Sequence, residues 1–443
     1  ADNRDYPCLY LYNYGGGKEL TARLPAFPKD LKQGGHNNLQ MIVESRENHI
    51  AKCKGEQAFP WRVVAVSEND VQMADNDMVY RLAAPADKSS DWSWVKPGKV
   101  AWDWWNDWNI RGVDFKSGVN NATYKYYIDF AAEYGVEYVI LDEGWSVNGA
   151  ADLFKVVPEI DLQELVTYAD SKGVGLILWA GYIAFERDME EVCRHYSEMG
   201  FKGFKIDFMD RQDQYMVNWY RRIIEEAAKW QLMVNLHGAY KQDGIERTWP
   251  NMMTREGVMG NEYNKWGTGI TADHNVKLAF TRMVAGPMDY TPGGFLNVTA
   301  DDHKAQQPAL VPNTRCAELS KFVIYESPLT VVCDHPDHII DQAGSDFLKI
   351  VKTQWDEIKF IGGAPEEYIA MAKRSGDEWF IGVMNNSMKR SVTIDTSFLG
   401  EGDYVITYWS DGKNPTDVIK KTVTIKAGKP IKVNLNSAGG YVA

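Results

Sequence analysis

The chain has no apolar run of the roughly 20 residues that a membrane-spanning helix requires. It also has no signal segment, in which a basic start precedes an apolar core. Positive charge is scarce, with 48 Lys and Arg against 61 Asp and Glu, so the net charge is −13. This balance argues against nucleic acid or an anionic membrane surface as a partner.

Two further kinds of site have little support. The five cysteines are scattered and odd in number, and none has metal-ligand spacing, so we expect free buried thiols with room for one disulfide. A glycine-rich phosphate cradle is missing, because Pro292-Gly293-Gly294 is too short and no Lys-Ser or Lys-Thr follows it. Nucleotide chemistry is therefore not expected.

Aromatic residues, in contrast, are abundant. They make up 12% of the 443 residues and include 16 Trp and 23 Tyr. Stacking on carbohydrate and the aromatic core of a large barrel both explain this excess, and composition does not separate them. The apolar content of 44% and charged content of 25% are those of an ordinary globular protein.

The pattern of elements predicts three domains. Residues 1–95 are β-rich and dense in Gly and Pro, with apolar segments at 38–44 and 61–66. Residues 96–357 alternate strands with amphipathic helices and complete eight strand–helix units, the rhythm of a (β/α)8 barrel. Residues 358–443 return to short strands joined by turns, which predicts an antiparallel β-sandwich. The barrel strands are expected at 100–104, 136–141, 174–179, 202–207, 232–237, 252–255, 287–290 and 329–333.

Several predicted barrel strands end in polar or aromatic residues. These are Asp142 and Glu143, Trp179, Asp207, and His237, while Asp289 and Asp334 also fall at strand ends without an assigned role. The carboxyl ends of parallel barrel strands meet on one face, so these side chains are expected to form one polar site.

Asp207 and Glu262 are the candidate catalytic pair. Retaining glycosidases use two carboxyl groups about 5–5.5 Å apart, one as nucleophile and one as acid/base. A strand end would hold Asp207 rigidly, and the loop after the sixth strand would bring Glu262 across the sugar. The alternatives are an Asp207 paired with Lys205 or Arg211, and a solvated Glu262.

Other motifs support a sugar site without deciding it. The segment Trp102–Trp108 holds four indoles, which suggests a sugar platform or a domain interface. Asp142 and Glu143 are suited to bind sugar hydroxyls, although acids at this position can also simply stabilise a turn or a helix start. Glu256 lies six residues before Glu262, so the two acids are candidates to share a hard cation, or are simply solvated. His237 either binds a ligand or is a barrel histidine whose hydrogen bonds are all made within the protein.

Five ordered segments resemble those of glycoside hydrolase family 97, which comprises bacterial exo-acting α-glucosidases and α-galactosidases. They are Lys96–Trp105, Leu141–Trp145, Gly203–Asp207, Asn235–Gly238 and Arg255–Glu262. The resemblance implies part of an N-terminal β-super-sandwich over 1–95, a catalytic (β/α)8 barrel over 96–357 and a C-terminal β-sandwich over 358–443. The N-terminal region is shorter than the family's, so we expect the chain to begin partway through that domain, where the family draws a further calcium ligand.

The chain resembles the retaining α-galactosidase branch. The inverting branch lacks an acid at the position of Asp207 and has Glu in place of Gly238. By resemblance Asp207 is the nucleophile, Glu262 is the acid/base, and Ca²⁺ is held by Glu256 and Glu262. The substrate-binding residues expected are Trp104, Asp142, Glu143, Trp179, Lys205 and His237.

The expected function is therefore a retaining exo-α-galactosidase acting on oligosaccharides, located in the periplasm or secreted. The alternatives are an inverting α-glucosidase of the same family and an inactive carbohydrate-binding protein. The sequence does not give the oligomeric state.

Overall fold

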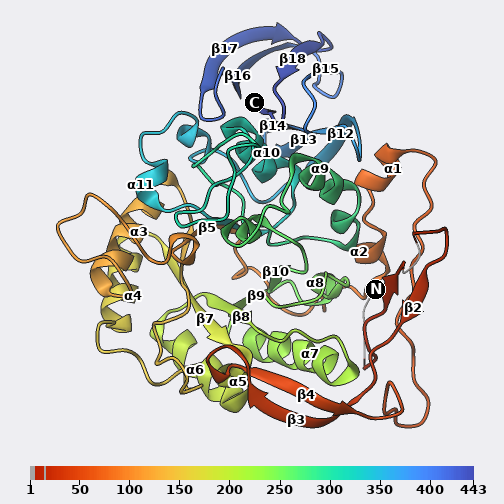
Figure 1. Cartoon of the computed structure of the whole chain (residues 1–443), viewed down its shortest axis with the longest axis vertical. Helices are drawn as coiled ribbons and strands as arrows, with labels where there is room; N and C mark the ends of the chain where they lie inside the picture. Colours follow the sequence, from red (N-terminus) through yellow and green to blue (C-terminus); the bar gives the residue numbers. More distant parts are fainter. Residues whose placement is uncertain (1–4, 14–15) are drawn as a thin grey trace.

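The centre of the structure is a parallel sheet curled into a nearly closed barrel (Figure 1). The computed structural model describes residues 5–13 and 16–443. The sheet has seven strands in the order β10-β9-β8-β7-β6-β5-β11. Their bounds are β5 Gly98–Trp102, β6 Tyr138–Leu141, β7 Gly175–Gly181, β8 Gly203–Asp207, β9 Met233–Leu236, β10 Met252–Arg255 and β11 Leu329–Val332. The (β/α)8-type architecture expected from the sequence is confirmed.

Local sequence explains where the first helix of the barrel begins and ends. Helix α3 (Asn121–Tyr134) starts after Asn120, whose side chain accepts a hydrogen bond from the Thr123 amide, and it stops at Gly135 with φ of 62°. A positive φ strains any residue that has a Cβ, so glycine is the natural stop signal. The others are α4 Leu162–Lys172, α5 Tyr182–Arg187, α6 Met189–Met199, α7 Gln214–Lys229, α8 Ile245–Thr248, α9 Ala272–Phe280, α10 Arg315–Ile324 and α11 Pro336–Ile339.

The predicted strand at 287–290 is wrong. This segment forms no ladder, and it joins its neighbours through single hydrogen bonds. The Asp289 amide donates to the Arg255 carbonyl at 2.9 Å, and the Cys333 amide donates to the Pro292 carbonyl at 2.9 Å. Proline has no amide hydrogen to donate, so Pro287 and Pro292 interrupt any regular pairing here. The segment nevertheless occupies the gap between β10 and β11.

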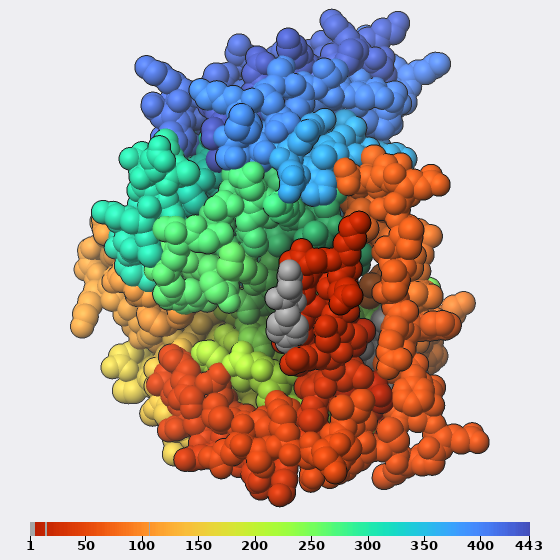
Figure 2. All heavy atoms as spheres, turned by 45° about the vertical axis from the view of Figure 1, so that its right-hand side comes forward, coloured from red at the N-terminus to blue at the C-terminus, as the bar shows by residue number. Residues whose placement is uncertain are grey.

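The N-terminal region wraps one side of the barrel, as Figure 2 shows in red and orange. Its strands form two hairpins, β1 (Tyr10–Tyr12) with β2 (Thr21–Arg23) and β3 (Pro28–Gly34) with β4 (Gln40–Arg46); the short helices α1 (Asp70–Ala74) and α2 (Met78–Leu82) follow. The prediction of a β segment at 61–66 is wrong, and Val64 and Val66 are 82% and 88% exposed. The apolar residues alternate as in a strand, but no sheet packs against their side chains.

The C-terminal region is an antiparallel sandwich, as predicted. A six-stranded sheet, in the order β12-β13-β14-β19-β16-β17, shares an apolar core with the β15–β18 pair. Gly440 of β19 and Gly382 of β14 let α10 approach closely, because a Cβ at either would collide with that helix. The bounds are β12 Glu357–Ala364, β13 Tyr368–Ser375, β14 Glu378–Asn385, β15 Arg390–Ile394, β16 Asp403–Asp411, β17 Val418–Lys426, β18 Ile431–Leu435 and β19 Gly440–Val442.

Two expectations from composition are also tested. Across the described residues, none of the helices combines the length and apolar character needed to span a bilayer. No disulfide joins cysteines of the described residues; four of the five are buried, as expected, but Cys53 is exposed.

Candidate active site

The carboxyl ends of neighbouring barrel strands bring the predicted residues together. Asp207 ends β8 and pairs in register with Gly181 of β7. His237 follows β9, and Glu256 follows β10. Glu262 lies on a 3-10 turn, Asn261–Lys265. A 2.9 Å hydrogen bond from the Asn261 amide to the Tyr290 carbonyl ties this turn to segment 287–290.

A buried ion pair lies beneath this site. Lys205 Nζ donates to Asp142 Oδ2 at 2.7 Å, and both side chains are 4% exposed. Trp102 Nε1 donates to the same carboxylate oxygen at 2.7 Å. Burial alone would lower the pKa of Lys205, but the charges of Asp142, Asp207 and Glu262 raise it above the ordinary lysine value. Lys205 is therefore a permanent cation among these acids.

The ion pairs proposed for Asp207 are not formed. Lys205 pairs with Asp142 instead, and Arg211 Nε pairs with Asp213 Oδ2 at 3.0 Å. Asp207 Oδ1 accepts a hydrogen bond from the Phe208 amide at 2.6 Å. Its carboxylate is thus positioned by the backbone at the strand end.

Glu262, Glu256 and His237 form a compact cluster. One ligand atom from each lies within 4.8 Å of the other two. Burial, followed by the charge of Glu256, raises the pKa of Glu262 to about 8. Burial also raises the pKa of Glu256. Both shifts favour the protonated form of these carboxyl groups.

His237 is held by a residue that the sequence left unassigned. Its Nε2 lies 2.7 Å from Asp289 Oδ2, and Asn235 Nδ2 donates to the same oxygen at 2.7 Å. Burial and the charge of Lys205 lower the pKa of His237, but the bond to Asp289 and the charges of Glu256 and Asp289 outweigh them and raise it to about 9. His237 is thus an imidazolium at neutral pH. The residue that favours this charge, Asp289, lies 52 residues away in the sequence, so local sequence does not predict it.

Gly238 has no side chain, and this leaves room for the Asp207 carboxylate. Its φ is +51°, and a Cβ built on it would lie 2.9 Å from Asp207 Oδ1 and 2.8 Å from the Phe208 amide nitrogen. Atoms at such distances overlap, so a side chain at 238 and the observed position of Asp207 exclude one another. The Gly238 amide also donates to Glu256 Oε2 at 3.0 Å.

Glu143 is engaged by the N-terminal hairpin rather than open to the barrel mouth. His36 Nε2 lies 2.8 Å from Glu143 Oε2, and Asn37 Nδ2 donates to Oε1 at 2.6 Å. The His36 ring also packs on Phe208, with centroids 4.9 Å apart. These contacts span more than a hundred residues, and no sequence pattern predicted them.

The predicted aromatic residues are partly covered. Trp179 is 4% exposed and packs edge-on against Phe208. Lys265 Nζ lies 3.4 Å from the ring centroid of Trp104, so one face of that indole is occupied. Trp102 and Trp105 are in the core, which leaves only part of the tryptophan cluster near a surface.

A cavity of about 630 Å³ borders the cluster at Gly238 and Glu256. Tyr10 and Tyr12 from the N-terminal region and Tyr263 beside Glu262 also line it. Such a volume is typical of small-molecule sites, and the mixture of tyrosine rings and charged groups suits a polar ligand with apolar faces.

Comparison with known proteins decides the family. Residues 1–85, 104–258 and 354–443 match the models described as Glycosyl-hydrolase 97 N-terminal, Glycoside hydrolase 97, and Glycosyl-hydrolase 97 C-terminal, oligomerisation. A retaining alpha-galactosidase of Bacteroides thetaiotaomicron is 47% identical over 449 residues, which cover 100% of this chain and 68% of that protein. The chain belongs to glycoside hydrolase family 97. Its enzyme class is therefore that of the glycoside hydrolases.

Other relatives agree with this assignment. A probable retaining alpha-galactosidase of Streptomyces bingchenggensis is 32% identical over 397 residues, or 88% of this chain and 58% of that protein. The family 97 enzyme from Pseudoalteromonas sp. strain K8, solved with acarbose, superposes with a TM-score of 0.85 at 26% identity and covers 100% of this chain and 71% of its own. The chain thus spans about two thirds of the length of these relatives.

The Lys205–Asp142 pair generates a stability prediction. Removing one partner leaves an uncompensated buried charge, so Lys205→Met and Asp142→Asn should each lower the free energy of unfolding by about 3–5 kcal/mol. The double variant should lose less than the sum of the two, because neither charge is then left alone. Urea denaturation of the four proteins measures this cycle.

The exposed pair Lys125–Glu164, with Nζ and Oε1 2.6 Å apart, is the matched control. Its cycle should show a coupling of about 1 kcal/mol or less. Additive losses at Lys205 and Asp142 would contradict the buried pair.

Proposed function

We propose that the chain carries the catalytic site of a retaining exo-α-galactosidase, which hydrolyses terminal α-galactosides of oligosaccharides by double displacement. The 47% identity to a retaining alpha-galactosidase over the whole chain supports the substrate class. The observation that carries the mechanism is the steric exclusion between Asp207 and any side chain at 238. The inverting relatives, which by resemblance carry Glu there, would not accommodate this carboxylate.

In the first step Asp207 attacks the anomeric carbon and forms a glycosyl ester. Its Oδ1 is held by the Phe208 amide, which leaves Oδ2 to form the new bond. The bond from the anomeric carbon to the leaving oxygen breaks, and the proton of Glu262 passes to that oxygen. The raised pKa of Glu262 keeps this proton available at neutral pH.

In the second step the roles of Glu262 reverse. Burial is the main cause of its raised pKa, but the charges of Glu256 and Asp207 add to it. The ester has no charge on Asp207, so the pKa of Glu262 falls while the intermediate exists, and Glu262, which has given its proton to the leaving oxygen, stays a carboxylate. As a carboxylate it takes a proton from water, whose oxygen attacks the anomeric carbon and returns Asp207 as a free carboxylate.

Six residues around the pair are proposed to bind the sugar: Trp104, Asp142, Glu143, Trp179, Lys205 and His237. Lys205 and His237 are cationic, so they can donate to sugar hydroxyls and offset the negative charge of the acids. His36 and Asn37 hold the orientation of Glu143. The resemblance to exo-acting bacterial enzymes supports a periplasmic or secreted location.

We also propose that Glu256 and Glu262 hold Ca²⁺. Their fit to this ion rests on two half-buried oxygen donors whose ligand atoms lie within 4.8 Å of one another. Ca²⁺ takes 6–8 oxygen ligands, roughly, so other oxygens must complete the shell. A bound divalent cation would offset the negative charge on these acids and help to orient the substrate.

The nucleophile is tested by removing its carboxylate. Asp207→Gly should abolish hydrolysis of an aryl α-galactoside, and azide should restore turnover with β-galactosyl azide as product, because azide attacks from the vacated side. Product analysis by NMR checks the configuration. The nearby Asp210→Asn should form no azide product, and near-normal activity of Asp207→Gly would exclude it as nucleophile.

The acid/base is tested by varying the leaving group. Glu262→Gln should lower kcat/KM by about 10²–10⁴-fold for oligosaccharides, whose leaving oxygen needs a proton. It should lower it far less for a dinitrophenyl α-galactoside, whose leaving group departs unaided. Equal losses across the leaving-group series would indicate a structural role instead.

The calcium site is tested by stability as well as activity. An ion that binds only the folded state raises the melting temperature, so added Ca²⁺ should raise it and chelation should lower it reversibly. Glu256→Ala should weaken Ca²⁺ affinity in calorimetry, whereas the exposed Glu159→Ala should not. If neither the melting temperature nor the activity changes with chelator or with calcium, the proposed Ca²⁺ site is wrong.

A further inference from the structure

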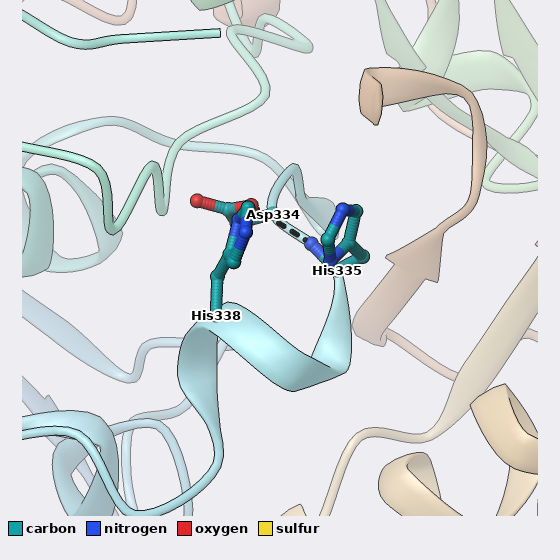
Figure 3. Close-up of side chains that lie close together, drawn as sticks. All are labelled: Asp334, His335 and His338. Atoms are coloured by element: carbon teal, nitrogen blue, oxygen red, sulfur yellow. Dashed lines mark hydrogen bonds and ion pairs between the residues drawn. The ribbon is translucent and has the colours of Figure 1, made fainter. Parts of the chain in front are cut away.

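A second group of side chains of types that bind metals lies after β11, and it shares no residue with the candidate active site. Asp334 lies two residues after that strand, His335 comes directly before α11, and His338 lies within this helix (Figure 3). Pro336 stands at the start of that short helix, where its fixed φ suits the first turn. The sequence Asp334–His338 therefore presents one carboxylate and two imidazoles from a single corner.

These side chains are already close enough to share an ion. One ligand atom from each lies within 4.8 Å of the other two. His338 Nδ1 lies 2.8 Å from Asp334 Oδ1, and the two imidazole rings have centroids 4.2 Å apart at 32°. Tetrahedral zinc with bonds of about 2.1 Å places its ligand atoms roughly 3.4 Å apart. Small rotations of these side chains would reach that arrangement.

A fourth residue orients one of the rings. The Asp337 carboxylate contacts His335 Nδ1, and it also accepts a hydrogen bond from the Arg111 amide at 3.3 Å. A histidine held at Nδ1 by a carboxylate has Nε2 left to bind a metal, and this carboxylate–histidine arrangement recurs around protein zinc ions. It is a second feature, independent of the cluster itself, that fits a metal site.

The cluster is mostly buried, but one of its side chains is accessible to solvent. The side chains of Asp334 and His335 are 0% and 3% exposed, whereas that of His338 is 13% exposed. Asp334 Oδ2 accepts from the Phe295 amide at 2.7 Å, so its carboxylate is already anchored. A fixed ligand set with one partly open side would admit an ion and a water molecule.

We propose that Asp334, His335 and His338 bind one divalent transition-metal ion of the zinc class. Two nitrogen donors and one oxygen suit zinc, whereas the carboxylates Glu256 and Glu262 suit the harder calcium ion. Water completes the coordination on the side of His338. The ion joins β11 to α11 and, through Asp337, to the loop that contains Arg111.

Cobalt(II) substitution tests this site directly. The whole chain is stripped of metal by chelation, dialysed into excess Ca²⁺ to occupy oxygen-rich sites, and titrated with Co²⁺. We expect one equivalent to bind with the visible absorption of tetrahedral Co²⁺, and Zn²⁺ to displace it and raise the melting temperature. The exposed thiol of Cys53 could also bind these ions, so the titration is repeated in Cys53→Ser.

Variants separate a metal site from a purely structural hydrogen-bond network. The absorption should disappear in His335→Ala and in His338→Gln, the second being a mild change at the partly exposed position. It should persist in His195→Ala, which removes a histidine on α6. Asp337→Asn should keep the spectrum but lower affinity by about 10–100-fold, as expected for a carboxylate that orients a ligand.

Each outcome decides the question. A stoichiometric tetrahedral spectrum that depends on His335 and His338 supports the site. Failure of the folded wild-type chain to bind Co²⁺ or Zn²⁺, or binding that persists when both histidines are replaced, overturns it and leaves a hydrogen-bond network. Neither result depends on the glycosidase activity.

Discussion

The buried ion pair between Lys205 and Asp142 is the interaction on which the active-site account depends. It places a permanent positive charge near Asp142, Asp207 and Glu262, whose negative charges would otherwise repel one another. Both partners come from the barrel's parallel sheet, Lys205 within β8 and Asp142 directly after β6. Folding of the sheet therefore assembles the electrostatic environment before any substrate arrives. Charge stabilisation prepared in this way costs no rearrangement during the reaction.

The environment also gives two acids opposite tasks. Asp207 accepts a backbone hydrogen bond at its strand end, whereas Glu262 is half-buried near Glu256, and desolvation together with the charge of Glu256 raises its pKa. Double displacement requires two carboxyl groups in different settings, one to attack and one to give a proton. Gly238 makes the arrangement sterically feasible, since any Cβ there would meet the Asp207 carboxylate. The absence of a side chain is thus as specific a feature of the site as the acids.

Local chemistry explains what the sequence predicted well. The cap at Asn120 and the glycine at 135 mark the ends of α3, and strand alternation places Asp207 at the barrel mouth. Predictions failed where partners are distant or missing. The strand expected at 287–290 does not form, because Pro287 within it and Pro292 after it have no amide hydrogen for a ladder. Nothing local identified Asp289 as the partner of His237. The contact of His36 with Glu143 joins separate regions, so only the folded chain reveals it.

The stereochemistry of the first-formed product tests the central claim most directly. Proton NMR of an aryl α-galactoside during early hydrolysis distinguishes the two anomers of galactose before mutarotation mixes them. Double displacement through Asp207 predicts that α-galactose appears first and that the β anomer grows only later. Initial formation of β-galactose would mean direct attack by water, and it would contradict the assignment of Asp207 as nucleophile and the role given to Gly238.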